Sequence, residues 1–145
     1  MFYLEIITPE KRIFEGHVKK LSVPTLDGEI TVLSQHAALF TPLEMGEVKV
    51  VTEAGKILYF SIGKGVLEVA KNKASLAIED AKSSDEISEK KAQEAIEKAK
   101  KILAEKPKGV DLIPVEKAFR RSFIDLKIAQ KRKKRSSFAP TKPSV

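Results

Sequence analysis

The pattern of apolar residues changes once along the chain, near residue 82, and this change restricts the possible folds more than any other feature. Before it, short apolar runs alternate with Gly, Pro, Asn and Asp, the residues that end strands and form turns. After it, apolar residues recur every three or four positions, which is the period of an amphipathic helix. We therefore expect a β-domain over residues 1–82 and a helical domain over residues 83–135.

The expected strands are short and are separated by recognisable turns. Apolar and β-branched runs occupy residues 2–8, 17–23 and 30–33, and two hairpins follow, 48–52 with 57–61 and 66–70 with 74–78. Strands of about five residues with turns every 8–12 residues are typical of a β-sandwich or barrel. We expect Asn72, in the turn of the second hairpin, to have a positive φ. Gly63 and Gly65 indicate a bulge or a close approach of two backbones.

The second part of the chain carries the signals of two helices. Ser83 and Glu86 have the spacing of a capping box, which predicts a helix start there. A first apolar stripe follows at Ile87, Ala92, Ala95, Ile96, Ala99, Ile102 and Leu103. Pro107 and Gly109 break the pattern, and Pro114 suits the first turn of a second helix. Its stripe is Val115, Ala118, Phe119, Ser122, Leu126 and Ala129, with Phe123, Ile124 and Ile128 beside it. Two such helices with a short loop predict an antiparallel hairpin.

The charge of the chain is concentrated at one end. The net charge is +7, and the last twenty residues hold seven basic residues and no acidic one, which equals the whole excess. A globular nucleic-acid-binding domain would instead carry its basic residues across the folded surface. The absence of cysteine excludes disulfides and thiolate chemistry. The longest apolar runs fall short of a membrane span, and the first nine residues do not resemble a signal peptide.

Candidate catalytic and ligand-binding residues are few. His17 and His36 are the only histidines, and neither has partners at metal-ligand spacing. Glu79 and Asp80 are adjacent, so in a strand they would point to opposite faces. Gly63-Lys64-Gly65 lacks the spacing of a phosphate-binding loop. We therefore expect no catalytic site, no metal site and no cofactor.

The block Lys131–Arg135 is the strongest local charge signal, and its residues alone leave several hypotheses open. It could bind nucleic acid, direct nuclear import, adhere to anionic lipid, meet an acidic protein surface, or simply keep the tail solvated. Nucleic-acid binding usually adds aromatic residues on which bases stack, and this tail offers only Phe138. Residues 136–145, rich in Ser, Pro and Lys, are expected to be a disordered tail.

One stretch is more specific than these patterns. Residues 22–43 read Ser-Val-Pro-Thr-Leu-Asp-Gly-Glu-Ile-Thr-Val-Leu-Ser-Gln-His-Ala-Ala-Leu-Phe-Thr-Pro-Leu, and Gly46 follows. This stretch resembles the signature of the epsilon subunits of bacterial F-type ATP synthases, and the similarity continues through residues 65–69, 72–81 and the helices, to about residue 130. The family usually has Gly, Pro, Gly and Pro where this chain has Thr31, Ser34, Gln35 and Ala38, and it often has Gly at Lys64.

The resemblance implies a β-sandwich of about ten strands followed by the helical hairpin, and a non-catalytic subunit of the rotor stalk. In the family the sandwich contacts the gamma subunit and the ring of c subunits, and it helps to couple proton-driven rotation to ATP synthesis. Glu29 and His36 match the family's contact residues on this side. The resemblance further implies a peripheral position at the cytoplasmic face of the bacterial inner membrane, with membrane contact only through the complex and no nucleic acid.

The resemblance also implies a regulatory role for the hairpin. In the family it switches between a folded form and an extended form that inserts among the beta and alpha subunits and inhibits ATP hydrolysis. The basic residues that would face an acidic segment of beta are Lys117, Arg120, Arg121, Lys127, Lys131, Arg132, Lys133, Lys134 and Arg135. Some relatives bind ATP through an Ile/Leu-Asp-x-x-Arg-Ala motif. Here Ser88 and Lys91 replace its Asp and Arg, and Lys lacks the bidentate guanidinium fork.

Overall fold

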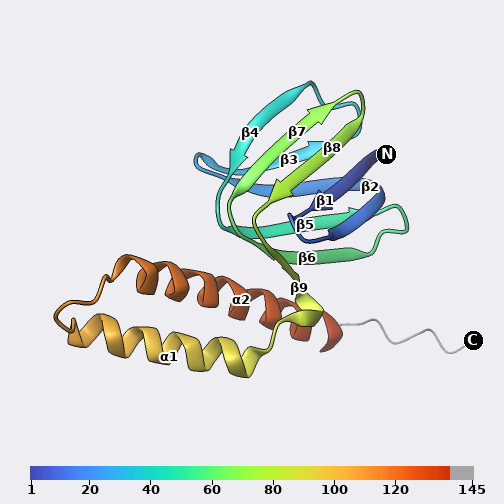
Figure 1. Ribbon diagram of the computed structural model, residues 1–145. Coiled ribbons are helices and arrows are strands. Elements are labelled where there is room, and N and C mark those ends of the chain that lie inside the picture. The colour runs from blue at the N-terminus through green and yellow to red at the C-terminus, as the bar shows by residue number, and fades with distance from the viewer. Residues whose placement is uncertain (138–145) are drawn as a thin grey trace, which may run out of the picture. The chain divides into compact units, whose positions relative to one another are not determined.

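The computed structural model describes residues 1–137, and it describes side chains as far as residue 132. Its contacts divide the chain into two compact units, Met1–Ser83 and Ser84–Val145. The first unit is built of strands and the second of helices (Figure 1). Of the expected disordered tail, Ser136 and Ser137 belong to a helix, and residues 138–145 lie outside the described residues.

The first unit is a β-sandwich, as expected, and the described residues form nine strands rather than about ten. The strands are β1 (Phe2–Ile7), β2 (Arg12–Thr25), β3 (Gly28–Leu33), β4 (Leu39–Leu43), β5 (Gly46–Thr52), β6 (Ile57–Ile62), β7 (Gly65–Ala70), β8 (Lys73–Ile78) and β9 (Ala81–Ser83). They pair in the order β4-β7-β8-β1-β2-β5-β6-β9, and β3 pairs with β2. All pairs are antiparallel except β1 with β8.

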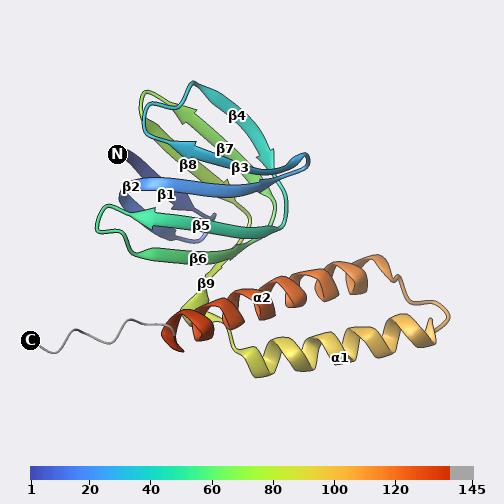
Figure 2. The ribbon, with the colours of Figure 1, turned by 180° about the vertical axis from the view of Figure 1, so that it is seen from behind.

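Strand β2 is twice as long as the sequence predicted, because it serves two sets of neighbours. Its first half pairs with β1, and its second half pairs with β3 and β5. Pro24 does not end it, since Pro24 pairs with Glu29 near the hairpin tip, where a missing donor is tolerated. The Pro24 carbonyl instead accepts a hydrogen bond of 3.0 Å from the Glu44 N–H. The β2–β3 hairpin projects from the sandwich (Figures 1 and 2).

The core of the sandwich follows the period of two expected for strands with one buried face. In β1, Phe2, Leu4 and Ile6 are buried while the residues between them are partly exposed. The largest fully buried side chains of the other strands are Val18, Leu21, Val23, Val32, Val48, Ile62, Leu67 and Leu76. Burial of such side chains supplies the main driving force for this unit.

The turn between β7 and β8 fixes one corner of the sandwich. Lys71 and Asn72 have φ angles of 49° and 58°, which confirms the expected positive φ of Asn72 and matches a tight hairpin turn. The Asn72 side chain accepts a hydrogen bond of 2.8 Å from Gln35 N–H and donates one of 2.9 Å to the Met1 carbonyl. Gln35 has a φ of 63°, so it adopts the left-handed conformation that glycine adopts without steric cost.

Two glycines allow the strand ends to approach closely, as predicted. A Cβ on Gly65 would lie 2.6 Å from Ile78 Cγ2, and one on Gly63 would lie 2.6 Å from Glu79 Cγ. Glu79 and Asp80 lie just beyond the end of β8, so the alternation of side chains along a strand does not apply to them. Both residues are exposed, and both side chains lie against Gly63.

The second unit contains a short 3-10 turn, Ser84–Glu86, and the helices α1 (Glu89–Glu105) and α2 (Ile113–Ser137). The expected capping box at residues 83–86 was wrong, because those residues are taken up by the end of β9 and by the turn. Ser88 caps α1 instead and accepts a hydrogen bond of 3.2 Å from Lys91 N–H. Lys106 ends α1 with a φ of 44°. Pro114 lies in the first turn of α2, as predicted.

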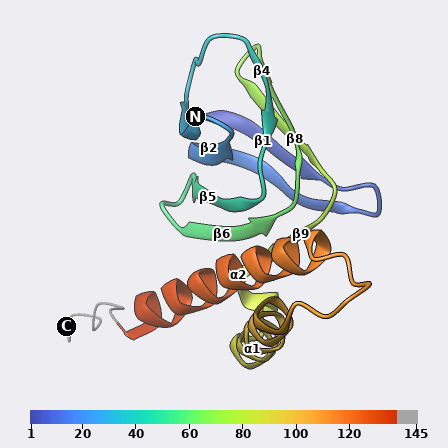
Figure 3. The same cartoon turned by 90° about the vertical axis from the view of Figure 1, so that its left-hand side faces the viewer.

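The two helices pack against each other as an antiparallel hairpin, and Figure 3 shows α2 crossing α1, which is seen nearly end-on. The buried apolar side chains of this unit are Ile87, Ala92, Ile96, Ala99, Ile128 and Ala129. The expected stripes were wrong at Ala95 and Ala118, which are exposed. Ile128, expected beside the second stripe, is fully buried. Among the described residues, no helix has both the length and the apolar character needed to cross a membrane.

Candidate protein-interaction surfaces

The tip of the β2–β3 hairpin is a small, well-ordered projection. Thr25 Oγ1 donates a hydrogen bond of 2.6 Å to the Gly28 carbonyl and accepts one of 3.3 Å from Asp27 N–H. Beside these contacts, Leu26 is 72% exposed and Glu29 is exposed. An exposed leucine next to carboxylates on a projecting turn suits contact with a partner that offers both apolar and basic groups. Leu26 lies inside the recognised motif, but the sequence alone did not show that it is exposed.

His36 lies in the loop beyond the other end of β3. Its Nδ1 is 2.7 Å from the Ala37 carbonyl, and because that oxygen can only accept, Nδ1 carries the proton. The backbone N–H of His36 donates to the Leu33 carbonyl at 3.2 Å. Strand β3 separates Glu29 from this loop by about 13 Å of extended chain, at ~3.3 Å per residue. The structure therefore places Glu29 and His36 toward opposite ends of β3 and does not bring their side chains together.

The expected basic residues of α2 fall into groups that the sequence did not separate. Four described side chains are exposed: Lys117, Arg120, Lys127 and Lys131. Arg121 is only 17% exposed, and its Nε lies 3.5 Å from Asp125 Oδ1, so its charge is paired within the helix. The Arg132 guanidinium donates a hydrogen bond to the Ser84 carbonyl at the start of the same unit. Lys133, Lys134 and Arg135 lie on α2, but their side chains are outside the described range.

An ion-paired network covers part of the outer face of β1 and β2. The Tyr3 hydroxyl and the Arg12 guanidinium both donate hydrogen bonds to Glu15. These bonds, first that of Tyr3 and then that of Arg12, lower the pKa of the Glu15 carboxyl. The bond to Glu15 also raises the pKa of the Tyr3 hydroxyl, because the neutral phenol is the donor. The network joins β1 to β2 at this surface, because Tyr3 lies on β1 and Arg12 and Glu15 lie on β2.

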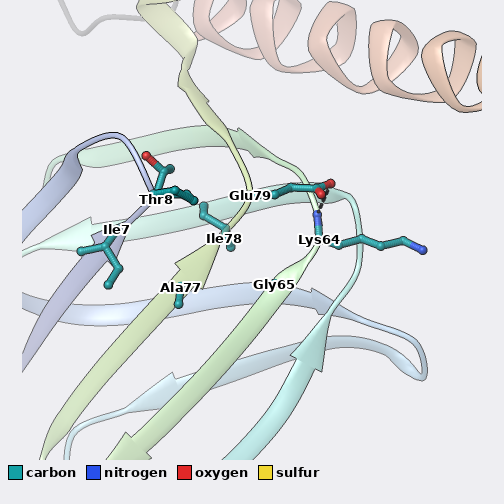
Figure 4. Close-up of a pocket in the computed structure, with 8 residues that line it drawn as sticks. Ile7, Thr8, Lys64, Gly65, Ala77, Ile78 and Glu79 are labelled. Atoms are coloured by element: carbon teal, nitrogen blue, oxygen red, sulfur yellow. Dashed lines mark hydrogen bonds between the residues drawn. The ribbon is translucent and has the colours of Figure 1, made fainter.

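One open depression of about 380 Å³ lies at the ends of β1, β7 and β8 (Figure 4). Its lining is mostly apolar: Ile7, Thr8, Pro9, Lys64, Gly65, Ala77, Ile78 and Glu79. Glu79 Oε1 accepts a hydrogen bond of 3.1 Å from Lys64 N–H, and the Lys64 ammonium extends away from the other lining residues. The depression thus lacks the convergent polar groups of a catalytic site. Within the described residues, no group of three or more His, Asp or Glu side chains is placed to hold a metal ion.

Comparison with known proteins gives consistent results at the level of sequence and of fold. Residues 1–84 match the family model described as ATP synthase, Delta/Epsilon chain, beta-sandwich domain. The chain is 36% identical over 137 residues to the ATP synthase epsilon chain of Endomicrobium trichonymphae, covering 92% of this chain and 97% of that relative. It is 28% identical to the sodium-ion-specific ATP synthase epsilon chain of Propionigenium modestum, covering 89% of this chain and 93% of that relative.

The fold has counterparts in solved structures. A chain in the cryo-EM structure of the Euglena gracilis mitochondrial ATP synthase, OSCP/F1/c-ring, superposes with a TM-score of 0.65 at 22% identity. The match covers 90% of this chain and 78% of that one. At this identity the structural similarity supports the fold alone. The family relationship rests on the family model and on the sequence identity to the epsilon chains.

Proposed function

Because this chain belongs to the ATP synthase delta/epsilon chain family, we propose that it couples rotation of the membrane ring to ATP synthesis and restrains ATP hydrolysis through its hairpin. It is a central-stalk subunit of the ATP synthase complex, and the catalytic chemistry belongs to other subunits. The observation that carries the proposal is the match of nearly the whole length, sandwich and hairpin together, to an epsilon chain.

The two ends of β3 are proposed to meet two different partners. The projecting tip with Leu26 and Glu29 would face the loops of the c-subunit ring, where a carboxylate can pair with basic groups. The His36 loop would face the gamma subunit. The position of the two residues toward opposite ends of β3 supports this division. Replacing Glu29 by Gln should weaken binding to the isolated ring and leave binding to gamma unchanged, and the reverse result would contradict the assignment.

Inhibition of ATP hydrolysis is proposed to depend on the basic residues at the end of α2. They would be attracted to an acidic segment of a beta subunit when the hairpin extends among the beta and alpha subunits. The attraction is electrostatic, so it should weaken as the ionic strength rises. The test replaces Lys131, Lys133, Lys134 and Arg135 by Gln and measures ATPase inhibition in the reconstituted complex at several ionic strengths.

The matched control for this test removes the same number of charges from the other helix. Lys90, Lys98, Lys100 and Lys101 of α1 are all exposed and can be replaced by Gln together. We expect the α2 variant to lose inhibition, most strongly at low salt, and the α1 variant to keep it. Equal inhibition by wild type and the α2 variant at every ionic strength would contradict the electrostatic mechanism.

The coupling ion and the location are proposed to be those usual in bacteria. We propose a proton-driven complex with this subunit held peripherally at the cytoplasmic face of the inner membrane, through gamma and the ring. A relative is named sodium-ion specific, so ATP synthesis by reconstituted vesicles should be measured with a proton gradient and with a sodium gradient. The competing hypothesis, a free nucleic-acid or anionic-lipid binder, predicts native co-purification with RNA, DNA or lipid and without gamma or the catalytic subunits.

A further inference from the structure

Helix α2 carries an outward stripe that combines one aromatic ring with cations. Arg120, Phe123, Lys127 and Lys131 are spaced three or four residues apart, so they lie along one side of the helix. All four are exposed, and the Phe123 side chain is 45% exposed. The stripe is therefore not part of the packing between the helices.

The Phe123 ring is held in place although it is exposed. It stacks on Phe119 one turn earlier, with ring centroids 6.4 Å apart and planes inclined by 22°. The Lys127 ammonium lies 5.0 Å from the centroid of the Phe123 ring, one turn later. These two contacts restrict the ring before any partner arrives. A restricted aromatic residue loses little conformational entropy on binding, which is the property of residues that dominate interface energies.

The charge around Phe123 is available to a partner, in contrast to the charge on the neighbouring side of the helix. Arg121 is paired with Asp125, and Arg132 is bonded to Ser84. Arg120 and Lys127 lie instead on the exposed stripe beside the ring. The stripe thus offers an aromatic anchor between two cations, and the complementary surface is an acidic segment with an apolar pocket.

A protein segment fits this stripe better than a membrane does. An interfacial membrane helix needs a broad apolar face, whereas here the exposed neighbours of Phe123 along the stripe are charged and only the partly exposed Phe119 adds apolar surface beside it. We infer that Phe123, flanked by Arg120 and Lys127, is the anchor through which α2 docks on an acidic protein segment that provides an apolar pocket. This inference rests on the proposed function, in which a catalytic-head subunit supplies that segment. It adds an apolar contact, made by Phe123, to the electrostatic attraction of the basic residues.

The test measures inhibition of ATP hydrolysis by the full chain in a reconstituted complex of alpha, beta and gamma subunits, because binding alone would also report the proposed contact of the sandwich with gamma. Phe123→Ala should lower the ratio of inhibited to active complex by at least about tenfold, as expected for an aromatic anchor, and the dependence on salt should stay the same. Val110→Ala, at an equally exposed apolar residue of the loop between the helices, is the matched control and should inhibit like wild type. Replacing Arg120 and Lys127 by Gln should weaken inhibition and also reduce its dependence on salt.

The outcomes distinguish this inference from the proposed function. If wild type neither binds nor inhibits the complex, the proposed function fails. If wild type binds and inhibits but Phe123→Ala does so equally, only the anchor is overturned. Phe123→Leu, which keeps apolar volume, serves as a second variant should the alanine variant unfold, and it should lose affinity less than alanine does. Binding to anionic vesicles or RNA that is lost in Phe123→Ala would overturn the choice of a protein partner.

Discussion

The bond between Arg132 and Ser84 makes a quantitative prediction about how firmly the hairpin is closed. Arg132 lies near the end of the described part of α2, and its guanidinium donates to a carbonyl 48 positions earlier in the sequence. Ser84 is 6% exposed. Among the described residues, its carbonyl accepts one other hydrogen bond, a long one of 3.4 Å from the Ile87 N–H. Arg132→Ala would leave this buried carbonyl poorly satisfied.

The size of the effect follows from the type of bond. A hydrogen bond from a charged donor contributes ~1.5–3 kcal/mol net when it is well buried. Arg132 is half-buried, so solvent screening reduces this to about 1–2 kcal/mol. Local opening of residues 84–87 and of the last turns of α2 should then be roughly tenfold more frequent, since 1.4 kcal/mol is a factor of ten.

Amide hydrogen exchange of the full chain, followed by mass spectrometry, reads this opening directly. Arg120→Ala is the control, because it removes an exposed cation from the same helix and should leave exchange unchanged. If the extended hairpin is the inhibitory form, Arg132→Ala should also strengthen inhibition, the opposite of removing the outward cations. Unchanged exchange at residues 84–87 in Arg132→Ala would refute the reasoning.

Three further predictions concern the sandwich, each measured on the full chain by urea denaturation. Gly65→Ala should destabilise it by about 1–3 kcal/mol, because the new Cβ would meet the backbone of Ala77 and the side chain of Ile78. Gln35→Gly should stabilise it by about 0.5–1 kcal/mol, because glycine adopts the φ of 63° without the steric cost that glutamine bears. Tyr3→Phe should remove a stabilisation with two pH limits. At acid pH, the lowered pKa of Glu15 gives a stabilisation that is complete above the usual carboxyl range. This stabilisation is lost as the pH falls through the pKa that Glu15 has in the folded protein. At alkaline pH, the raised pKa of Tyr3 gives a stabilisation that is complete below about pH 10. This stabilisation is lost as the pH rises through the pKa that Tyr3 has in the folded protein.

Each of these predictions has a result that would contradict it. A Gly65→Ala variant as stable as wild type would mean that the two strand ends separate at little cost. A destabilised Gln35→Gly variant would show that the unfolded-chain entropy of glycine outweighs the relief at this turn. A constant stability difference between wild type and Tyr3→Phe from acid to alkaline pH would show that the hydrogen bond to Glu15 does not shift either pKa.

Local signals in the sequence were sufficient for the hairpins and insufficient for strands defined by distant partners. The β5–β6 and β7–β8 hairpins were predicted because turn residues stand between two apolar runs. Strand β4 was missed because it contains Pro42 and forms only by pairing with β7, more than twenty residues later. The start of α1 was misplaced because two serines compete as caps, and packing around the turn selects Ser88.

The candidate surfaces, like the strands, could be predicted from the sequence only in part. The motif around Glu29 and His36 was visible in the sequence, but their separation follows from the pairing of β3 along β2. The basic residues of α2 looked equivalent in the sequence, because nothing local marks the partner of Arg132 on Ser84. Arg121 and Asp125 are four residues apart, which is the spacing of a helical ion pair, so this pair could be predicted from the sequence.

The place of β1 in the sheet has a consequence for synthesis of the chain. Strand β1 lies between β2 and β8, and its parallel pairing with β8 joins Tyr3 to Lys73. During synthesis β1 must therefore wait for about 70 residues, some 4–14 s at roughly 5–20 residues per second, before its second neighbour exists. Until then one side of β1 is an unpaired edge that can join another nascent chain. The sandwich thus folds late and as one unit, and a chain truncated before β8 should aggregate rather than fold in part.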